Sequence, residues 1–171
     1  DPFTATALRR CLRDSIQWDT LHGVYDGIRD ETPAQGYVTP EAVVGGNDVY
    51  RNEKNAIPYA TRVANAKKLM AQGLKQLESG SLRFELLAAD DPVSADIARY
   101  LVQSWQKNLG IYPTLTLLPA ADLNRRVQSG NYQAAIYTHT PTGNTAAENL
   151  ALFGSDSVGN LSNLQNTDVD A

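Results

Sequence analysis

The sequence predicts an α/β domain in which a βαβαβ unit forms a parallel-rich sheet with flanking helices. Three short apolar segments, residues 82–88, 111–118 and 132–138, have the length and composition of strands. A helical pattern at about 94–109 separates the first two, and a second that begins at Pro119 separates the last two. Strands that alternate with helices at this spacing return to one sheet in the same direction, so we expect parallel strands.

Local signals mark the ends of the longest helix. Asp90 or Asp91 followed by Pro92 places a cap and a proline in the order that helix starts favour. Asn108 and Gly110 mark its end. Negative charge at a helix start complements the helix dipole, so we interpret the two aspartates as a cap and not as an acid–base pair. The apolar stripe expected on this helix consists of Ile97, Leu101, Val102, Trp105 and Leu109.

Two further helices precede the sheet. Thr4 or Thr6 is expected to cap the first, whose apolar residues recur at three- and four-residue spacing as far as Ile16. The second runs over about 61–77. Gly73 lies inside it, where a glycine costs about 1 kcal/mol relative to alanine.

The remaining segments are rich in turn residues. Residues 23–58 are expected to form an ordered irregular segment with little regular structure, and loops of this length are often functional. Within it, Gly45-Gly46-Asn47 indicates a turn, because no strand and helix flank it as a nucleotide-binding loop would require. We expect a short helix over 145–153 and a polar tail over 154–171 in which a helix begins near Asp168.

Size and charge limit the possible functions. A chain of 171 residues fits a single domain spanning residues 1–171. The net charge of −4 and the pI of about 5.1 argue against a general nucleic-acid binder. Lys67, Lys68 and Lys75 fit the solvated face of a helix. The sequence shows no signal peptide and no membrane span, and it begins with Asp1 and Pro2, so we expect it to be a fragment.

The sequence offers little catalytic chemistry. Cys11 falls on the apolar side of its helix, which is typical of a small buried hydrophobic residue. His22 and His139 lie far apart, without the spacing of metal ligands, and no common catalytic or phosphate-binding motif occurs. We therefore predict no catalytic residue, no metal site and no cofactor, and we expect that the protein is not an enzyme.

Four blocks of the chain, in order, share a pattern with one protein family. They are Ala7–Ile16 (ALRRCLRDSI), Gly36–Pro40 after Pro33-Ala34, Tyr59 with Ala64–Met70 (ANAKKLM), and Ile97–Phe153, which contains Ala98–Ile111 (ARYLVQSWQKNLGI) and Gly130–Ala135 (GNYQAA). The tail, with Gly159–Asn163 and Asp168–Asp170, fits as well. Together these blocks resemble the peptide and nickel class of extracellular solute-binding proteins, which includes the oligopeptide- and dipeptide-binding proteins of ABC importers.

The resemblance implies one lobe of a two-lobed periplasmic-binding-protein-like fold, with the ligand held between the lobes. This chain would be an incomplete C-terminal lobe. Its implied partners are a peptide or other small solute, the ABC transporter permease and the other lobe of the same protein, with no nucleic acid and no direct membrane span. The implied location is the periplasm or the outer face of the cell membrane, as a periplasmic protein or a lipoprotein.

The candidate ligand contacts follow the third predicted strand. In an open parallel sheet, ligands bind outside the carboxyl ends of the strands, and this strand ends at about Thr138. The candidate ligand-binding residues are Tyr137, Thr138, His139, Thr140, Thr142 and Asn144. Their hydroxyl and amide groups suit a ligand backbone, and His139 suits stacking or donation. An ordinary polar loop accounts for the same residues equally well.

One departure from the family pattern bears on the ligand. Members that hold a peptide's free amine have a carboxylate after this strand, but residues 137–144 contain no Asp or Glu, and Thr142 stands at the acidic position. A buried ammonium without a charged partner is costly. Either the ligand lacks a conventional free amine, or a carboxylate elsewhere replaces the missing one.

Three functions remain open at this point. The first is a ligand-binding lobe that captures peptides or similar small solutes for import. The second is a solute-sensing lobe of a transcriptional regulator, and the third is an enzyme built on the same sheet topology.

Overall fold

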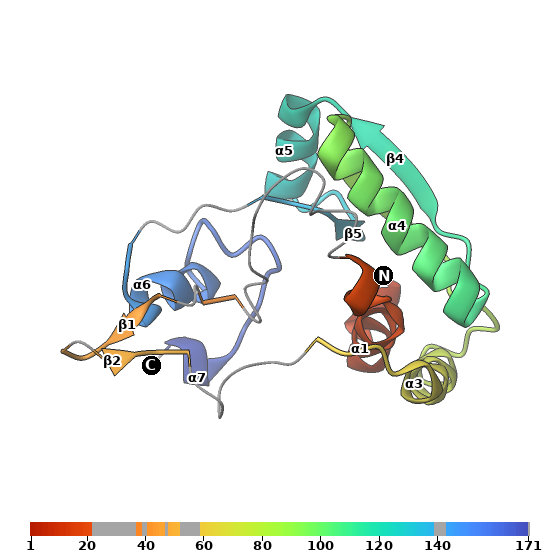
Figure 1. Cartoon of the computed structure of the whole chain (residues 1–171), viewed down its shortest axis with the longest axis horizontal. Coiled ribbons are helices and arrows are strands. Elements are labelled where there is room, and N and C mark those ends of the chain that lie inside the picture. The colour runs from red at the N-terminus through yellow and green to blue at the C-terminus, as the bar shows by residue number, and fades with distance from the viewer. Residues whose placement is uncertain (22–36, 39–40, 47, 52–58, 139–142, 171) are drawn as a thin grey trace. The chain divides into compact units, whose positions relative to one another are not determined.

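The computed structural model describes residues 1–21, 37–38, 41–46, 48–51, 59–138 and 143–170. Its internal contacts divide the chain into two compact units, of which the first comprises residues 1–31 and 59–137 and the second residues 32–58 and 138–171. Each unit is described by itself, and Figure 1 labels their helices and strands. Most of the segment 23–58, for which we predicted little regular structure, lies outside the described residues.

A three-stranded parallel sheet forms the centre of the first unit. Its strands are β3 (Glu85–Ala89), β4 (Thr114–Leu118) and β5 (Ala134–Ala135), in the order β4-β3-β5. Leu87 of the central strand lies opposite Thr116 on one side and Ala135 on the other. The predicted α/β class and parallel pairing are therefore confirmed.

The strands are shorter than the sequence predicted. β3 begins at Glu85 and not at residue 82, and β4 begins at Thr114 and not at residue 111. The first bond between them runs from the Thr114 N–H to the Phe84 carbonyl, at 3.0 Å. No pairing is found before Glu85 and Thr114, so the ladder begins at this point. β5 is reduced to two residues, although the N–H of Ile136 still donates to the Leu87 carbonyl at 2.8 Å.

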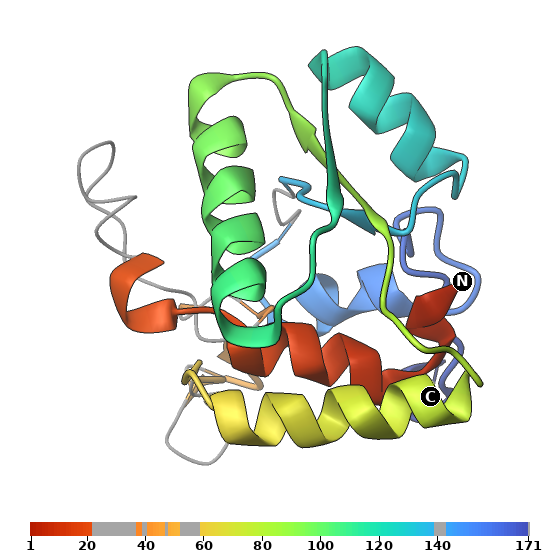
Figure 2. The ribbon, with the colours of Figure 1, turned by 90° about the vertical axis from the view of Figure 1, so that its right-hand side faces the viewer.

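Two helices cover opposite faces of this sheet. Figure 2 shows α4 (Pro92–Leu109) on one side and α5 (Ala120–Gln128) on the other. Because side chains alternate along a strand, Leu86 and Ala88 join the core that contains Trp105 of α4. Glu85 lies on the other face, where Arg126 of α5 binds it.

The caps of these helices follow the sequence signals. Asp91 is the N-cap of α4, its carboxylate accepts a hydrogen bond from the Ser94 N–H at 3.0 Å, and Pro92 follows. Gly110 ends α4 with φ at 67°, the left-handed conformation that glycine adopts without strain. α5 begins at Ala120, one residue after the predicted start, with Pro119 as its N-cap.

The buried face of α4 differs from the expected stripe. Trp105 and Leu109 are buried as predicted, and the partly buried Leu101 and Val102 pack against the core, whereas Ile97 is only partly buried. Three further buried positions of α4 hold small residues, namely Ala95, Ala98 and Ser104. Small side chains allow a helix to lie close to its neighbours, so close packing selects alanine here over larger apolar residues.

Helix α1 (Thr6–Ser15), preceded by the 3₁₀ turn η1 (Pro2–Thr4), packs along α3 (Val63–Gln76). The predicted threonine cap is wrong. Ala5 is the N-cap without a side-chain bond, because η1 delivers the chain to the helix, and the Thr6 hydroxyl instead accepts from Arg9.

At Gly73 the backbone of α3 lies very close to α1. A Cβ atom at Gly73 would lie 2.5 Å from Cγ of Leu8, nearer than real Cβ contacts allow. Gly73 lowers the helix propensity of α3, as predicted, but it also has a packing role, since its missing side chain lets α3 approach α1. Lys67, Lys68 and Lys75 lie exposed on α3, as expected.

The second unit contains a short antiparallel hairpin of β1 (Val43–Val44) and β2 (Asp48–Val49). Gly45 and Gly46 connect them with φ values of 41° and 69°, which confirms the predicted turn. The unit also holds α6 (Ala146–Leu150), the 3₁₀ turn η2 (Ala151–Phe153) and α7 (Thr167–Asp170), which match the predicted short helix and the helix start near Asp168. Its buried apolar cluster is Val38, Ala42 and Ala146.

No helix in the described part of the chain combines the length and apolar character that a membrane crossing requires.

Candidate functional site

The strand order creates a topological switch point beside the central strand. From β3 the chain passes through α4 to β4 on one side, and then through α5 to β5 on the other side. In open α/β sheets, the crevice outside the carboxyl ends of the strands at such a point is where ligands bind. In this sheet the switch point lies between the ends of β3 and β5, at Asp90 and Ile136.

The loop after β3 is tied to the neighbouring strand and to α4. The Asp90 N–H donates to the Leu118 carbonyl at 2.9 Å, and Asp91 caps α4. Hydrogen bonds from the Ser94 side chain and backbone lower the pKa of the Asp91 carboxyl. An exposed carboxylate with a lowered pKa is a poor general acid near neutral pH, so the interpretation of this aspartate as a cap is supported.

The predicted ligand contacts are only partly described by the structure. Tyr137 follows β5 at the end of the first unit, with 36% of its side chain exposed. Thr138 and Asn144 belong to the second unit, and both are exposed. His139, Thr140 and Thr142 lie outside the described residues. Tyr137 is the member of the set that lies beside the switch point, and a ligand-binding role for the set remains a prediction.

Asn144 is held by its own unit. Its carbonyl accepts a hydrogen bond from the Val43 N–H at 2.9 Å, which ties the end of the candidate loop to the hairpin. The next residue, Thr145, forms a capping box with Glu148 at the start of α6. The hydrogen bonds from Thr145 lower the pKa of the Glu148 carboxyl. The signal was present in the sequence as Thr-x-x-Glu before a helical segment, but the sequence reasoning did not use it.

The amide of Asn149 also supports this loop. Asn149 is 1% exposed, and its side-chain nitrogen donates to the carbonyls of Gly143 at 3.3 Å and Thr145 at 2.8 Å. A buried amide that bonds two loop carbonyls fixes the local backbone. The segment 143–145 therefore has a defined conformation within its unit.

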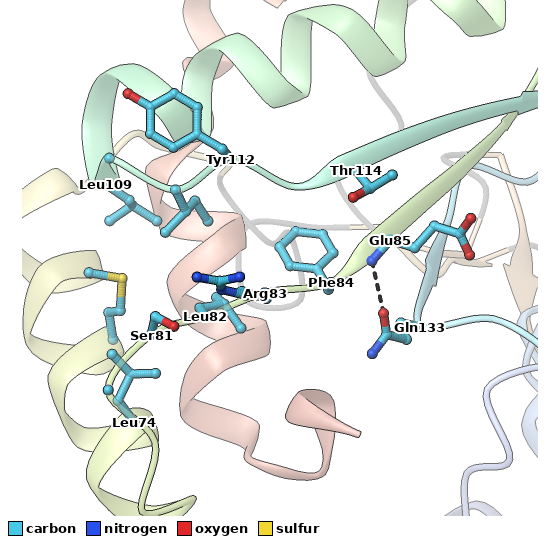
Figure 3. Close-up of a pocket in the computed structure, with 14 residues that line it drawn as sticks. Leu74, Ser81, Leu82, Arg83, Phe84, Glu85, Leu109, Tyr112, Thr114 and Gln133 are labelled. Atoms are coloured by element: carbon cyan, nitrogen blue, oxygen red, sulfur yellow. Dashed lines mark hydrogen bonds between the residues drawn. The ribbon is translucent and has the colours of Figure 1, made fainter.

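A groove lies at the opposite edge of the sheet, where no site was predicted. It has a volume of about 910 Å³ and lies at the amino ends of β3 and β4 (Figure 3). Met70 and Leu74 of α3 line it together with Arg83 and Tyr112 of the segments that lead into the strands. The sequence reasoning missed it because the groove depends on where two distant segments separate.

Glu85, which lines this groove, already has hydrogen-bond partners. Arg126 binds Glu85 at 2.7 Å, and Thr116 donates to the same carboxylate at 2.6 Å. These hydrogen bonds, that of Arg126 first, lower the pKa of the Glu85 carboxyl. The Glu85 N–H donates to the Gln133 side chain at 2.8 Å (Figure 3). Glu85 is therefore an ionised and partnered carboxylate.

The thiol is unsuited to nucleophilic chemistry. Cys11 is fully buried, and burial, together with the charge of Asp14, raises its pKa to about 12. The prediction of a small buried hydrophobic residue is confirmed. Among the residues that the structure describes, no group of three His, Cys, Asp or Glu side chains is placed to hold a metal ion.

Solved structures of peptide-binding proteins share the fold of this chain. A crystal structure of the peptide-binding protein of a peptide ABC transporter matches with a TM-score of 0.87 and 20% identity, over 99% of this chain and 75% of that chain. The oligopeptide ABC transporter substrate-binding domain of Bacillus anthracis matches with a TM-score of 0.86 and 18% identity, over 99% of this chain and 33% of that one. OppA of Listeria monocytogenes, solved bound to peptide, matches with a TM-score of 0.81 and 20% identity, over 98% of this chain and 33% of that one.

These likenesses show the fold, and the chain spans about one third of the length of the Listeria and Bacillus proteins. A comparison with curated proteins gave no match. The profile of the bacterial extracellular solute-binding proteins, family 5 (middle region), matches residues 24–160. This match covers most of the sequence, both strand–helix–strand crossovers and the candidate loop, and the chain therefore belongs to family 5 of the bacterial extracellular solute-binding proteins.

Proposed function

We propose that residues 1–171 form one incomplete C-terminal lobe of a substrate-binding protein that captures peptides, or similar small solutes, for an ABC importer. The observation that carries the proposal is the family match over residues 24–160. The similar Listeria protein was solved with a peptide bound, which supports peptides as the first ligands to test. No observation favours the solute-sensing lobe of a transcriptional regulator.

In this proposal the ligand binds at the carboxyl edge of the sheet. The switch point between β3 and β5 supports this placement, because ligands of open α/β sheets bind outside the carboxyl ends of the strands at such a point. Tyr137 supplies an aromatic surface beside it, and the loop that follows supplies the hydroxyl, imidazole and amide groups of Thr138, His139, Thr140, Thr142 and Asn144. The other lobe of the protein closes over the ligand and removes it from water.

The proposal includes partners and a location. The partners are the solute, the other lobe and the membrane permease of the importer. The protein works outside the cytoplasm, in the periplasm or at the outer face of the cell membrane. The lobe binds its ligand and releases it unchanged, which the match to a family of solute-binding proteins supports.

Native mass spectrometry of the full-length protein, purified without denaturation, tests this function. We expect co-purifying masses that fragment as peptides and remain chemically unchanged during incubation. A bound ligand of another class would move the specificity away from peptides. Conversion of a bound ligand into a product would contradict the proposal that this is a binder.

A pair of tyrosine variants tests the position of the site. In the full-length protein, Tyr137→Ala is expected to weaken peptide binding about fivefold or more, since an aromatic side chain that packs on a ligand contributes about 1 kcal/mol or more. Tyr112→Ala is the matched control, because Tyr112 is 76% exposed and lies at the opposite edge of the sheet. Equal affinities for the two variants would place the ligand elsewhere.

A further inference from the structure

The end of the candidate ligand loop, residues 143–145, is held through its own backbone. The side-chain nitrogen of Asn149 donates to the carbonyls of Gly143 at 3.3 Å and Thr145 at 2.8 Å. Between these two, the Asn144 carbonyl accepts from the Val43 N–H at 2.9 Å. Each carbonyl of this three-residue segment therefore has a partner within its own unit.

The carboxylate of Glu148 holds the N–H side of the same segment. It accepts from the Thr145 hydroxyl at 2.8 Å and from the Thr145 N–H at 3.0 Å. Hydrogen bonds from the Thr145 side chain first, and then from the backbone of Thr145 and Asn144, lower the pKa of the Glu148 carboxyl. A Cβ atom at Gly143 would lie 2.1 Å from Oε2 of Glu148, so the lack of a side chain at residue 143 leaves room for the carboxylate.

The helix that carries these supports is itself packed in place. Ala146, the first residue of α6, is buried and clusters with two buried apolar residues of the segment before β1. Val43 forms a bridge with Thr145, and Figure 1 shows β1 beside α6. Asn149 is 1% exposed, so little water reaches its amide to compete for the two loop carbonyls.

The segment offers one side chain to a ligand. Gly143 has none and Thr145 uses its hydroxyl in the capping box, whereas Asn144 is exposed. An amide side chain carries both donors and an acceptor, so it can bond the N–H or the carbonyl of a peptide unit. A backbone that is ordered before the ligand arrives spares the binding step the entropic cost of ordering it.

We propose that Asn149 is a positioning residue of the ligand site, which orders residues 143–145 in advance so that the Asn144 amide bonds the backbone of a peptide. This inference rests on the proposed function, because it takes the loop as part of the peptide site. Asn149 does not touch the ligand and acts through Asn144. The affinity for peptides therefore depends on a buried residue of α6 as well as on the exposed loop.

Calorimetric titration of the full-length protein with pentaalanine tests the inference. This probe has only methyl side chains, so its affinity mainly reports contacts to the peptide backbone. Asn149→Leu keeps the approximate size of the side chain and removes the amide, and it should weaken binding about tenfold. In an Asn144→Ala background the same change should weaken binding less than about twofold, because the side chain that Asn149 positions is absent.

Asn160→Leu is the matched control. The Asn160 amide donates to the carbonyls of Gly154 at 3.2 Å and Leu164 at 2.7 Å, so it supports a different loop of the same unit in the same way. This change should lower the stability of the unit and leave the affinity of the folded protein unchanged. Thermal unfolding of each variant shows whether it is folded at the temperature of the titration.

Hydrogen exchange of the wild-type protein keeps the test informative if Asn149→Leu does not fold. The segment 143–150 should already be protected without pentaalanine, because its hydrogen bonds form before binding. Protection that appears only with the peptide would overturn the inference.

The outcomes separate this inference from the proposed function. Equal affinities of the wild-type protein and Asn149→Leu would overturn the inference and leave the function standing. An equal loss in Asn149→Leu and Asn160→Leu, or a full loss in the Asn144→Ala background, would show a general structural effect and would also overturn it. Failure of the wild-type protein to bind pentaalanine would count against peptides as ligands, and so against both.

Discussion

The two compact units of this chain are stabilised in different ways. The first unit buries large apolar side chains from helices and sheet together, including Leu8, Leu87 and Trp105. The described part of the second unit has a small apolar cluster of Val38, Ala42 and Ala146, with Tyr50 packed against it. Burial of apolar area is the dominant favourable term in folding, so the first unit has the larger source of stability.

Side-chain hydrogen bonds hold several turns of the second unit. The capping box of Thr145 and Glu148 starts α6, and Asp170 accepts from both the backbone N–H and the hydroxyl of Ser155 at 2.7 Å. The Asn160 amide bonds the Leu164 carbonyl at 2.7 Å. Each such bond contributes only about 0.5–1.5 kcal/mol, so local changes in this unit should have smaller effects than core changes in the first.

The largest effect is expected from the core tryptophan. Trp105 is 4% exposed, its ring lies 5.6 Å from that of Phe84, and its N–H donates to the Leu12 carbonyl at 3.0 Å. Trp105→Ala should lower the free energy of unfolding by about 3–5 kcal/mol, measured by urea denaturation. Trp18→Ala is the control, because Trp18 is only partly buried; an equal loss in both variants would contradict the comparison.

A smaller but more specific loss is expected at Gly73. Gly73→Ala should destabilise the first unit by about 1–3 kcal/mol, because the added methyl group collides with Leu8. Gly80→Ala is the matched control, since a Cβ there meets nothing within 4 Å. Leu8→Ala should reduce the effect of Gly73→Ala in a double-mutant cycle. Stabilisation by Gly73→Ala, as helix propensity alone predicts, would show that the two helices are not held this closely.

The buried carboxylate of Asp14 should make the first unit sensitive to acid. Burial alone would raise its pKa, but hydrogen bonds from Asn65 at 2.7 Å and from Arg13 outweigh burial and lower it. A folded pKa below the unfolded value, about 3.9, means that the ionised form stabilises the fold above that pH and that this stability is lost as the pH falls through the folded pKa.

Asp14→Asn tests this dependence. We expect a loss of about 1–3 kcal/mol at pH 7, because the Arg13 charge loses its partner. The difference from wild type should be constant between pH 5 and pH 7, about one unit and more above the unfolded pKa, and should shrink below about pH 4. Denaturant midpoints across this range provide the measurement, and a difference that grows on acidification would reverse the assigned sign.

The smallest effect is expected in the second unit. Thr145→Ala removes the hydroxyl that accepts from the Glu148 N–H at 3.1 Å, and should cost about 0.5–2 kcal/mol of local stability. Hydrogen exchange within 146–150 should become faster, while the sheet amides of the first unit keep their rates. Thr145→Ser retains the hydroxyl and should restore protection. Faster exchange in both units would show that they do not open separately.

Much of the fold could be predicted from sequence because its signals are local. Asp91-Pro92, Gly110, Pro119 and Gly45-Gly46 each impose a cap or turn through their own backbone or side-chain chemistry, and each occurs where it was expected. Apolar segments separated by helical ones predicted the parallel sheet. The candidate site was predicted only as an edge of that sheet. Tyr137 follows β5 at that edge, and its role in ligand binding stays a prediction.

Other features of the fold depend on distances between residues far apart in the chain, and only the tertiary structure determines them. The strand order β4-β3-β5 sets which loops meet at the switch point, and no single segment encodes it. Gly73 appears in the sequence as a weak point of a helix, and only the position of Leu8 shows that a larger side chain does not fit. The groove exists because β3 and β4 pair only from Glu85 and Thr114 onward, although both apolar segments begin earlier in the sequence. Sequence signals act over a few residues, whereas close packing and strand separation are settled only when the whole unit is assembled.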